Sequence, residues 1–235
     1  MHRTEIRSDV LERILKRRGQ RHIHSVVNAA STALVVIDMQ NAFVDRANPS
    51  AVPMAQRIVP TINRLAASLR ESGGAVIWVY STFDETTKTQ WGAFFGGVYS
   101  DEFSEAVIAQ LCVESRGHAL WRELDLQDDD RQFSKDRFSA FLPGHCDLPE
   151  YLRQQQIDTV LIAGTVTNVC CESSARDALM QNFNVIMVSD ANAALSDADH
   201  NASMTAIAQT FGDVMDCDEL LQRLQPIPAG QQALR

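Results

Sequence analysis

A cysteine stands where a predicted strand turns into a predicted helix, in the segment Gly164-Thr-Val-Thr-Asn-Val-Cys170. The apolar stretch 158–163 before it is typical of a short buried strand, and residues 172–183 favour a helix. Cys170 is therefore expected in the first helical turn. There, unpaired backbone N–H groups and the positive end of the helix dipole would favour a thiolate and could hold an oxyanion. This position is typical of a nucleophile.

Two further segments end in residues that a thiol-dependent hydrolase needs. The apolar run from Ala33 ends in the carboxylate of Asp38, and the segment 131–138 carries the ammonium of Lys135 among aromatic residues. With a cysteine, these groups suit acyl transfer through a covalent thioester, in which the carboxylate takes the thiol proton and the lysine stabilises both anions. The carboxylate would then protonate the leaving amine and activate the water that hydrolyses the thioester.

Each of the three residues alone also has an interpretation without catalysis. A cysteine flanked by apolar residues, such as Cys170, is commonly a packing residue. Asp38, at a strand end, could hold a metal or cap a helix, and Lys135 could be a solvated surface residue, as most lysines are. The joint pattern is more specific, because three separate strand ends carry compatible groups.

From Thr32 onward, apolar strand patterns alternate with helical patterns, which is typical of βαβ units and a parallel sheet. The expected strands are 33–38, 75–80, 132–135, 159–163, 185–189 and 213–215. Helices are expected at 9–18, 54–71, 198–210 and 218–224, besides the one after Cys170. The predicted fold class is α/β, with a doubly wound, mostly parallel six-stranded sheet and helices on both faces.

In an open parallel sheet, ligands bind beyond the carboxyl ends of the strands. Asp38, Lys135 and the turn before Cys170 each lie at or just past such an end. We therefore expect these three side chains to converge at one crevice, although they are far apart in the sequence.

Length and composition favour one soluble α/β domain. A chain of 235 residues with 45% apolar content can build a sizeable core, and no run reaches the roughly 18 apolar residues of a membrane span. No signal-peptide stretch follows the charged start, so a cytoplasmic location without a membrane partner is expected. The net charge of −9, with no basic face or run after the first two dozen residues, argues against a nucleic-acid partner. The five scattered cysteines fit reduced thiols.

Two regions lie outside the simple strand and helix alternation. Residues 1–31 are predicted to form an N-terminal helical arm and linker ahead of the main domain at 32–235. This arm either packs over its own domain or crosses to a neighbouring subunit. The region 82–97 contains Trp91-Gly-Ala-Phe-Phe-Gly-Gly97 and is expected to be a long loop that acts as a lid.

The motifs around the three residues resemble those of the isochorismatase-like cysteine hydrolases, a group that includes nicotinamidases, N-carbamoylsarcosine amidase and ureidoacrylate amidohydrolase. The resemblance runs from Thr32 to Leu224. Its marks are Val-Val-Ile-Asp38-Met-Gln-Asn-Ala-Phe43, Lys135-Asp-Arg-Phe-Ser-Ala-Phe141, and the Gly164 to Cys170 segment followed by Ala-Arg-Asp177. The last of these is highly specific.

This resemblance implies a catalytic triad of Asp38, Lys135 and Cys170, with an oxyanion hole formed by the backbone N–H groups of Val166 and Cys170. It also implies a cis peptide bond between Thr165 and Val166, and self-association into a homo-oligomer.

Two departures from the family pattern refine the expected activity. The Asp-x-His metal-binding motif of nicotinamidases has no counterpart, because 45–48 reads Asp-Arg-Ala-Asn, so no metal site is expected. True isochorismatases carry glycine at the nucleophile position, so Cys170 favours hydrolysis of a C–N bond in a small amide, carbamoyl or ureido compound. The alternatives are vinyl-ether hydrolysis with Asp38 as general acid, and a non-catalytic binding protein of the same fold.

Other residues near these motifs are candidates for binding or for packing. Phe43, Trp91 and Arg137 are candidate substrate contacts, although Arg137 could equally form a structural ion pair. Cys171 points about 100° away from Cys170 around the helix axis and is expected in the core. No Gly-x-Gly-x-x-Gly follows the first strand, so no dinucleotide is indicated and no cofactor is expected. The expected partners are a small-molecule substrate and a second copy of the chain.

Overall fold

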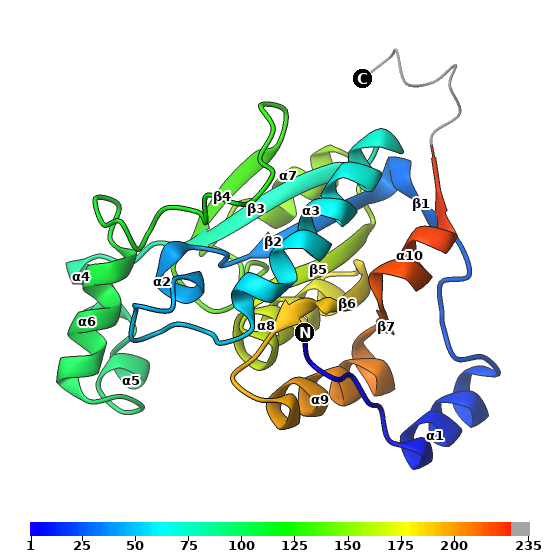
Figure 1. Cartoon of the computed structure of the whole chain (residues 1–235), viewed down its shortest axis with the longest axis horizontal. Helices are drawn as coiled ribbons and strands as arrows, with labels where there is room; N and C mark the ends of the chain where they lie inside the picture. Colours follow the sequence, from blue (N-terminus) through cyan, green and yellow to red (C-terminus); the bar gives the residue numbers. More distant parts are fainter. Residues whose placement is uncertain (227–235) are drawn as a thin grey trace.

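The computed structural model describes residues 1–226, and the last residues of the predicted domain, 227–235, lie outside the described residues. Its centre is a six-stranded sheet of order β4-β3-β2-β5-β6-β7 in which every neighbouring pair is parallel (Figure 1). The strands are β2 (Thr32–Ile37), β3 (Ala75–Ser81), β4 (Arg131–Lys135), β5 (Thr159–Thr165), β6 (Asn184–Ala193) and β7 (Asp213–Met215).

The central strands are buried on both faces. All residues of β2 and β5 are buried, as expected for parallel strands covered by helices on either side. Alternate residues of β2 point to opposite faces, so that Leu34 and Val36 belong to one apolar cluster and Val35 and Ile37 to another.

Helices cover both faces of the sheet. Against the Leu34 face pack α3 (Ala55–Glu71) and α10 (Cys217–Arg223). Against the Val35 face pack α1 (Ser8–Arg18), α7 (Leu148–Gln154), α8 (Glu172–Met180) and α9 (Asp197–Ala206). In α3 the buried positions, including Ile58, Ile62, Leu65 and Leu69, recur every three or four residues, which places them on one stripe.

The predicted architecture is confirmed. All six expected strands are present, and the helices expected at 9–18, 54–71, 198–210 and 218–224 each overlap an observed helix. The helix expected at 198–210 is α9 followed by a π-helical turn at Ile207–Phe211.

The expected long loop over 82–97 is wrong. This region forms two short helices, α4 (Glu85–Gln90) and α5 (Gly92–Phe95), and α6 (Asp101–Leu111) follows them. Asp84 begins α4 with a capping box, because its carboxylate accepts hydrogen bonds from the N–H groups of Thr86 and Thr87. The three helices project together as a separate group beside the short helix α2 (Asn41–Val44) (Figure 1).

The N-terminal arm packs on its own chain. Val10 and Ile14 of α1 are buried in the cluster on the Val35 face. Farther along, β1 (Val27–Asn28) pairs in parallel with β8 (Leu224–Gln225), and a 3₁₀ turn at Ala29–Ser31 then delivers the chain to β2. The arm and the end of the described chain therefore lie side by side.

Among residues 1–226, no helix has both the length and the apolar character that a membrane span needs.

Candidate active site

Three neighbouring strands deliver polar side chains to the same edge of the sheet. Asp38 follows β2 directly, Ser81 ends β3 and Lys135 ends β4. The Lys135 Nζ lies 2.8 Å from Asp38 Oδ2 and 2.7 Å from Ser81 Oγ, and Ser81 Oγ donates to Asp38 Oδ1 at 2.9 Å. Asp38 and Lys135 are each only 1% exposed. A buried ion pair with a bridging hydroxyl thus forms at the carboxyl edge, where ligands of parallel sheets bind.

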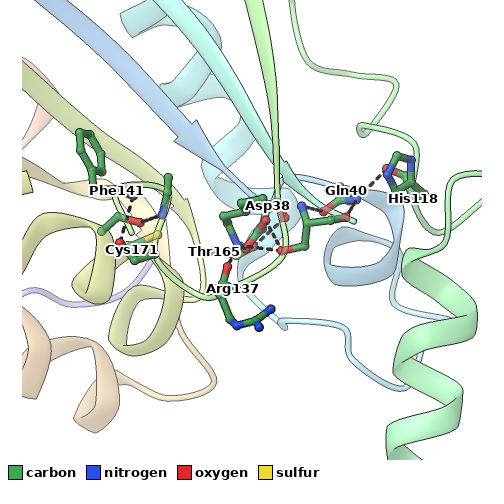
Figure 2. Close-up of polar contacts among 12 residues, drawn as sticks. Asp38, Gln40, His118, Arg137, Phe141, Thr165 and Cys171 are labelled. Atoms are coloured by element: carbon green, nitrogen blue, oxygen red, sulfur yellow. Dashed lines mark hydrogen bonds and ion pairs between the residues drawn. The ribbon is translucent and has the colours of Figure 1, made fainter. Parts of the chain in front are cut away.

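The backbone of Asp38 holds its carboxylate in place. Its φ of 53° lies in the left-handed region, which aspartate tolerates better than most residues. The Asp38 N–H donates to the carbonyl of Val79 at 2.8 Å, and the Thr165 hydroxyl donates to the Asp38 carbonyl at 2.8 Å (Figure 2). Asp38 is therefore tied to both strands that flank β2.

Cys170 lies in the turn that links β5 to α8. This turn is a π-helical segment, Thr167–Cys171, so the expected first α-helical turn is wrong in detail, and α8 begins two residues after the cysteine. The peptide bond between Thr165 and Val166 is cis, as the resemblance implies. A hydrogen bond from the Val166 backbone reaches the Cys170 thiol, which is 7% exposed. The sulfur therefore sits beside one of the two predicted oxyanion-hole groups.

The electrostatics at Cys170 differ from the expectation. Burial raises the pKa of the Cys170 thiol well above its usual range, and the nearby Asp38 charge and a hydrogen bond with Asp38 raise it further, while Lys135 opposes them. The expected stabilised thiolate is therefore wrong for the resting state, because the turn buries the sulfur and places it next to a carboxylate. Burial lowers the pKa of Lys135, but the charge of Asp38 and its hydrogen bond with the ammonium oppose this, and the pKa is raised from its ordinary value. The ammonium thus stays charged at neutral pH.

Two residues of this site were missed in the sequence. Ser81 bridges the ion pair, and Gln40 holds Ser81 by accepting from its N–H at 2.8 Å and donating to its carbonyl at 3.0 Å. Gln40 also donates to the carbonyl of His118 at 2.8 Å (Figure 2). Ser81 stands at the carboxyl end of a predicted strand, as Asp38 does, and that position is the signal that could have identified it.

A cavity of about 230 Å³ opens over the sulfur. Cys170, Val166 and Ser81 line it, and so does Phe43, one of the predicted substrate contacts. The lining does not include the other two, Trp91 and Arg137.

The Trp91 and Arg137 side chains pack against one another instead. The Arg137 guanidinium lies over the Trp91 ring at 5.0 Å from its centroid and donates to the carbonyl of Asp136 at 2.8 Å. Figure 2 shows the Arg137 side chain directed away from Asp38, while its backbone carbonyl accepts from Lys135 Nζ at 3.1 Å. Arg137 therefore contributes a backbone group to the site.

Cys171 is fully buried in the core cluster on the Val35 face, as expected for a packing residue. Within residues 1–226, no group of three or more histidine, cysteine or acidic side chains is arranged to hold a metal ion.

The comparison with protein families agrees with this geometry. The model of the isochorismatase domain matches residues 32–219, which is most of the chain. The chain belongs to the isochorismatase family. The match spans the Asp38, Lys135 and Cys170 segments, and it confirms the resemblance inferred from their motifs.

Similar proteins include hydrolases of amides. The uncharacterized isochorismatase family protein YecD of Escherichia coli O157:H7 is 31% identical over 84% of this chain and 98% of its own length. Ureidoacrylate amidohydrolase RutB of Variovorax paradoxus is 27% identical over 86% of this chain and 85% of its own length. A crystal structure of a cysteine hydrolase from Pseudomonas syringae pv. phaseolicola is 30% identical, covering 84% of this chain and 93% of that chain, with a TM-score of 0.75. This chain is thus an isochorismatase-family hydrolase with amidohydrolase relatives.

Proposed function

We propose that this protein hydrolyses the C–N bond of a small amide, carbamoyl or ureido compound through a thioester on Cys170. The observation that carries the proposal is the buried ion pair of Asp38 and Lys135 beside a cysteine that lines a cavity. The amidohydrolase and cysteine hydrolase relatives support the same chemistry.

In the first half of the reaction, Asp38 acts as general base. The Cys170 thiol is protonated at rest, so the proton passes to the Asp38 carboxylate as the sulfur attacks the carbonyl carbon. The tetrahedral oxyanion is stabilised by the backbone N–H groups of Val166 and Cys170. Asp38 then gives its proton to the leaving nitrogen, the C–N bond breaks, and the thioester remains.

In the second half, water replaces the amine. Asp38 takes a proton from the water as its oxygen attacks the thioester carbon, and the proton returns to the departing sulfur of Cys170. Lys135 keeps its charge throughout and holds the carboxylate in position through the 2.8 Å ion pair. The products are a carboxylic or carbamic acid and an amine or ammonia.

Vinyl-ether cleavage is less well supported by this arrangement. That reaction needs an acid for the ether but no nucleophilic sulfur, whereas here Cys170 lines the cavity and its thiol is within hydrogen-bonding reach of Asp38. Burying two charges costs desolvation free energy. A binding protein without catalysis gives no functional reason for the buried pair of Asp38 and Lys135.

The experiment is a screen of primary amides, carbamoyl compounds and ureido compounds by ammonia release, with hydroxylamine present in parallel reactions. An acyl thioester is intercepted by hydroxylamine to give a hydroxamate, which an ether hydrolase cannot produce. Replacing Cys170 by alanine should lower the rate on the order of 1,000-fold or more. Cys112→Ala is the matched control, because Cys112 lies outside the lining of this cavity. Full activity in the Cys170→Ala variant would show that the nucleophile is another group.

The self-association implied by the family resemblance is part of this proposal. Light scattering on the full chain measures the molar mass directly. A mass equal to one chain at all concentrations would contradict self-association.

A further inference from the structure

The cavity over Cys170 is lined without a charged side chain. Among the described residues that line it, none is arginine, lysine, histidine, aspartate or glutamate. Apart from Cys170, the polar residues of this lining are Ser50, Ser81, Tyr99 and Asn168. A substrate that carries a carboxylate would therefore find no counter-ion in this wall.

The ammonium nearest to the thiol is already saturated. Lys135 has three N–H donors, and they are directed to Asp38 Oδ2 at 2.8 Å, Ser81 Oγ at 2.7 Å and the Arg137 carbonyl at 3.1 Å. The lysine side chain is also fully buried. It has no donor left for an anionic substrate.

The guanidinium next along the chain is engaged elsewhere. Arg137 lies over the Trp91 ring, donates to the carbonyls of Asp136 and Gln90 at 2.8 and 3.4 Å, and lies 3.4 Å from the Asp136 carboxylate. Its side chain does not line the cavity. Lys135 and Arg137 thus both bind other groups of the protein, and neither contributes a charge to the cavity wall.

Much of the cavity wall is aromatic and aliphatic. Phe94, Phe103, Val107 and Leu111 from the helices α5 and α6 line it together with Phe138. Phe94 packs edge-on against Phe138 with ring centroids 4.9 Å apart, so α5 and the segment after β4 form one apolar surface. Binding becomes more favourable when this surface covers a hydrocarbon group of the substrate. It becomes less favourable when the substrate must bring a charged group out of water.

Two polar side chains in the wall can orient a neutral substrate. Tyr99 and Asn168 line the cavity, and both are exposed. A phenol hydroxyl and a carboxamide are uncharged hydrogen-bonding groups, so a substrate oxygen or nitrogen that pairs with either of them gains a defined orientation.

We propose that the substrate is an uncharged amide whose remaining part is a compact hydrophobic group, aromatic or aliphatic, and that a compound with a carboxylate on that part is a poor substrate. This inference rests on the proposed amide hydrolysis and adds the substrate class. Ureidoacrylate, which carries a carboxylate, lies outside this class, so this chain and the relative named for that substrate differ in specificity.

The experiment compares amides matched in shape and different in charge. Benzamide is paired with 4-carbamoylbenzoate, and hexanamide with adipamate, each assayed by ammonia release at neutral pH. The neutral member of each pair is expected to have a kcat/KM higher by roughly 100-fold or more, because the charged member buries an unpaired carboxylate. Equal or reversed values overturn the inference.

A charge placed at the mouth of the cavity tests whether the missing counter-ion causes the preference for neutral amides. Leu195 lines the cavity and is 65% exposed, so a long polar side chain there leaves the core intact. Leu195→Arg is expected to narrow the preference for the neutral amide by about tenfold or more, whereas Leu195→Gln, the uncharged control of similar length, is expected to keep it. Equal effects of the two variants contradict the electrostatic explanation.

A separate variant tests the apolar contribution of α6 to substrate binding. Phe103→Ala removes a ring from the wall and should raise KM for hexanamide about tenfold more than for acetamide, because acetamide is too short to cover that ring. Equal rises for both amides contradict hydrophobic selection.

The two levels of the proposal fail in different ways. If no compound in the broader screen of amides, carbamoyl compounds and ureido compounds yields ammonia or hydroxamate, the proposed C–N bond hydrolysis itself is wrong. If the carboxylated amides are hydrolysed best and the Cys170→Ala variant abolishes that activity, the reaction stands and the substrate class proposed here is wrong.

Discussion

At the scale of single residues, Ser81 helps to hold the buried charges of Asp38 and Lys135 in a fixed arrangement. Its hydroxyl accepts from Lys135 and donates to Asp38, so that it fixes the second oxygen of the carboxylate while the lysine fixes the first. A carboxylate held by both oxygens presents one defined lone pair to its reaction partner. Ser81 is therefore a positioning residue for the base.

Replacing Ser81 by alanine should lower kcat/KM by roughly 10- to 100-fold, because the lost hydrogen bonds loosen Asp38 and leave a buried donor of Lys135 without a partner. Steady-state kinetics on an amide found in the screen measures the loss. The pH profile of kcat/KM should shift in the same variant, which a merely structural role would not cause. Ser81→Thr keeps a hydroxyl and should restore much of the rate. Unchanged kinetics and pH profile in Ser81→Ala would contradict this role.

The resting protonation of Cys170 gives a second residue-scale prediction. Because burial and Asp38 raise the pKa of this thiol, iodoacetamide at pH 8 should alkylate it more slowly than Cys112, which is partly exposed. Replacing Asp38 by asparagine removes the carboxylate that opposes the thiolate, so alkylation of Cys170 should become several-fold faster while hydrolysis is lost. Peptide mass spectrometry measures both rates, with Cys112 as the internal control. Faster labelling of Cys170 than of Cys112 in the unchanged protein would contradict the raised pKa.

The candidate site was predictable where side-chain chemistry and strand ends coincide. Asp38, Lys135 and Cys170 carry groups that are recognisable in the sequence, and each stands at or after the end of a predicted strand. Ser81 meets the same positional criterion, but a serine at a strand end is chemically ordinary until its hydrogen bonds are seen. The protonation of Cys170 was not predictable, because it depends on how deeply the turn buries the sulfur and on the carboxylate beside it.

At the scale of elements, β5 lies very close to β2 at Gly164, shortly before the turn that carries Cys170. Gly164 has φ of 116°, and a Cβ atom built there would lie 2.0 Å from the carbonyl oxygen of Ile37. No side chain fits between these strands, and the backbone of β2 cannot retreat without moving Asp38. The glycine thus sets the spacing between the base and the nucleophile.

Gly164→Ala should therefore destabilise the protein by about 3 kcal/mol or more, through backbone strain and a clash with β2. Gly144→Ala is the matched control, because Gly144 also has a positive φ, 79°, but has open space around its Cβ position. The control should lose only about 1 kcal/mol. Urea denaturation measures both values. Equal losses in the two variants would show that the approach to Ile37 is not the cause.

The strands of the sheet were more predictable from the sequence than the short helices α4 and α5. The strands β2, β3, β5 and β6 contain apolar runs whose pattern is visible without tertiary structure, and all six expected strands are present. The helices α4 and α5 are too short to show a period, and glycines at 92, 96 and 97 favoured a loop. Their helical form depends on the Asp84 cap and on packing of Phe95 into a cluster with Phe83 and Leu111. Such contacts join residues whose proximity only the fold creates.

At the scale of the whole molecule, the N-terminal arm reaches the nucleophile turn through two stacked histidines. The His2 ring lies on the His200 ring with centroids 4.6 Å apart, and His2 Nδ1 lies 2.7 Å from Asp197 Oδ1. The fully buried His200 lies between the hydroxyls of Thr4, at 3.2 Å, and Thr167, at 3.1 Å. Thr167 begins the turn that ends at Cys171, so the arm, α9 and the active-site turn form one connected unit.

This arrangement predicts a specific loss of stability in acid. Burial first, and His2 second, lower the pKa of His200 to about 4 from its ordinary 6.5, with Asp197 opposing them. The folded protein holds this ring neutral, so its contribution is complete above pH 6.5 and is lost as the pH falls from 6.5 to about 4. A shift of this size corresponds to roughly 3 kcal/mol. Urea denaturation across this pH range measures it. His200→Gln cannot titrate and should be less stable at pH 7 but should show a flatter slope, whereas parallel slopes for the two proteins would exclude His200 as the cause.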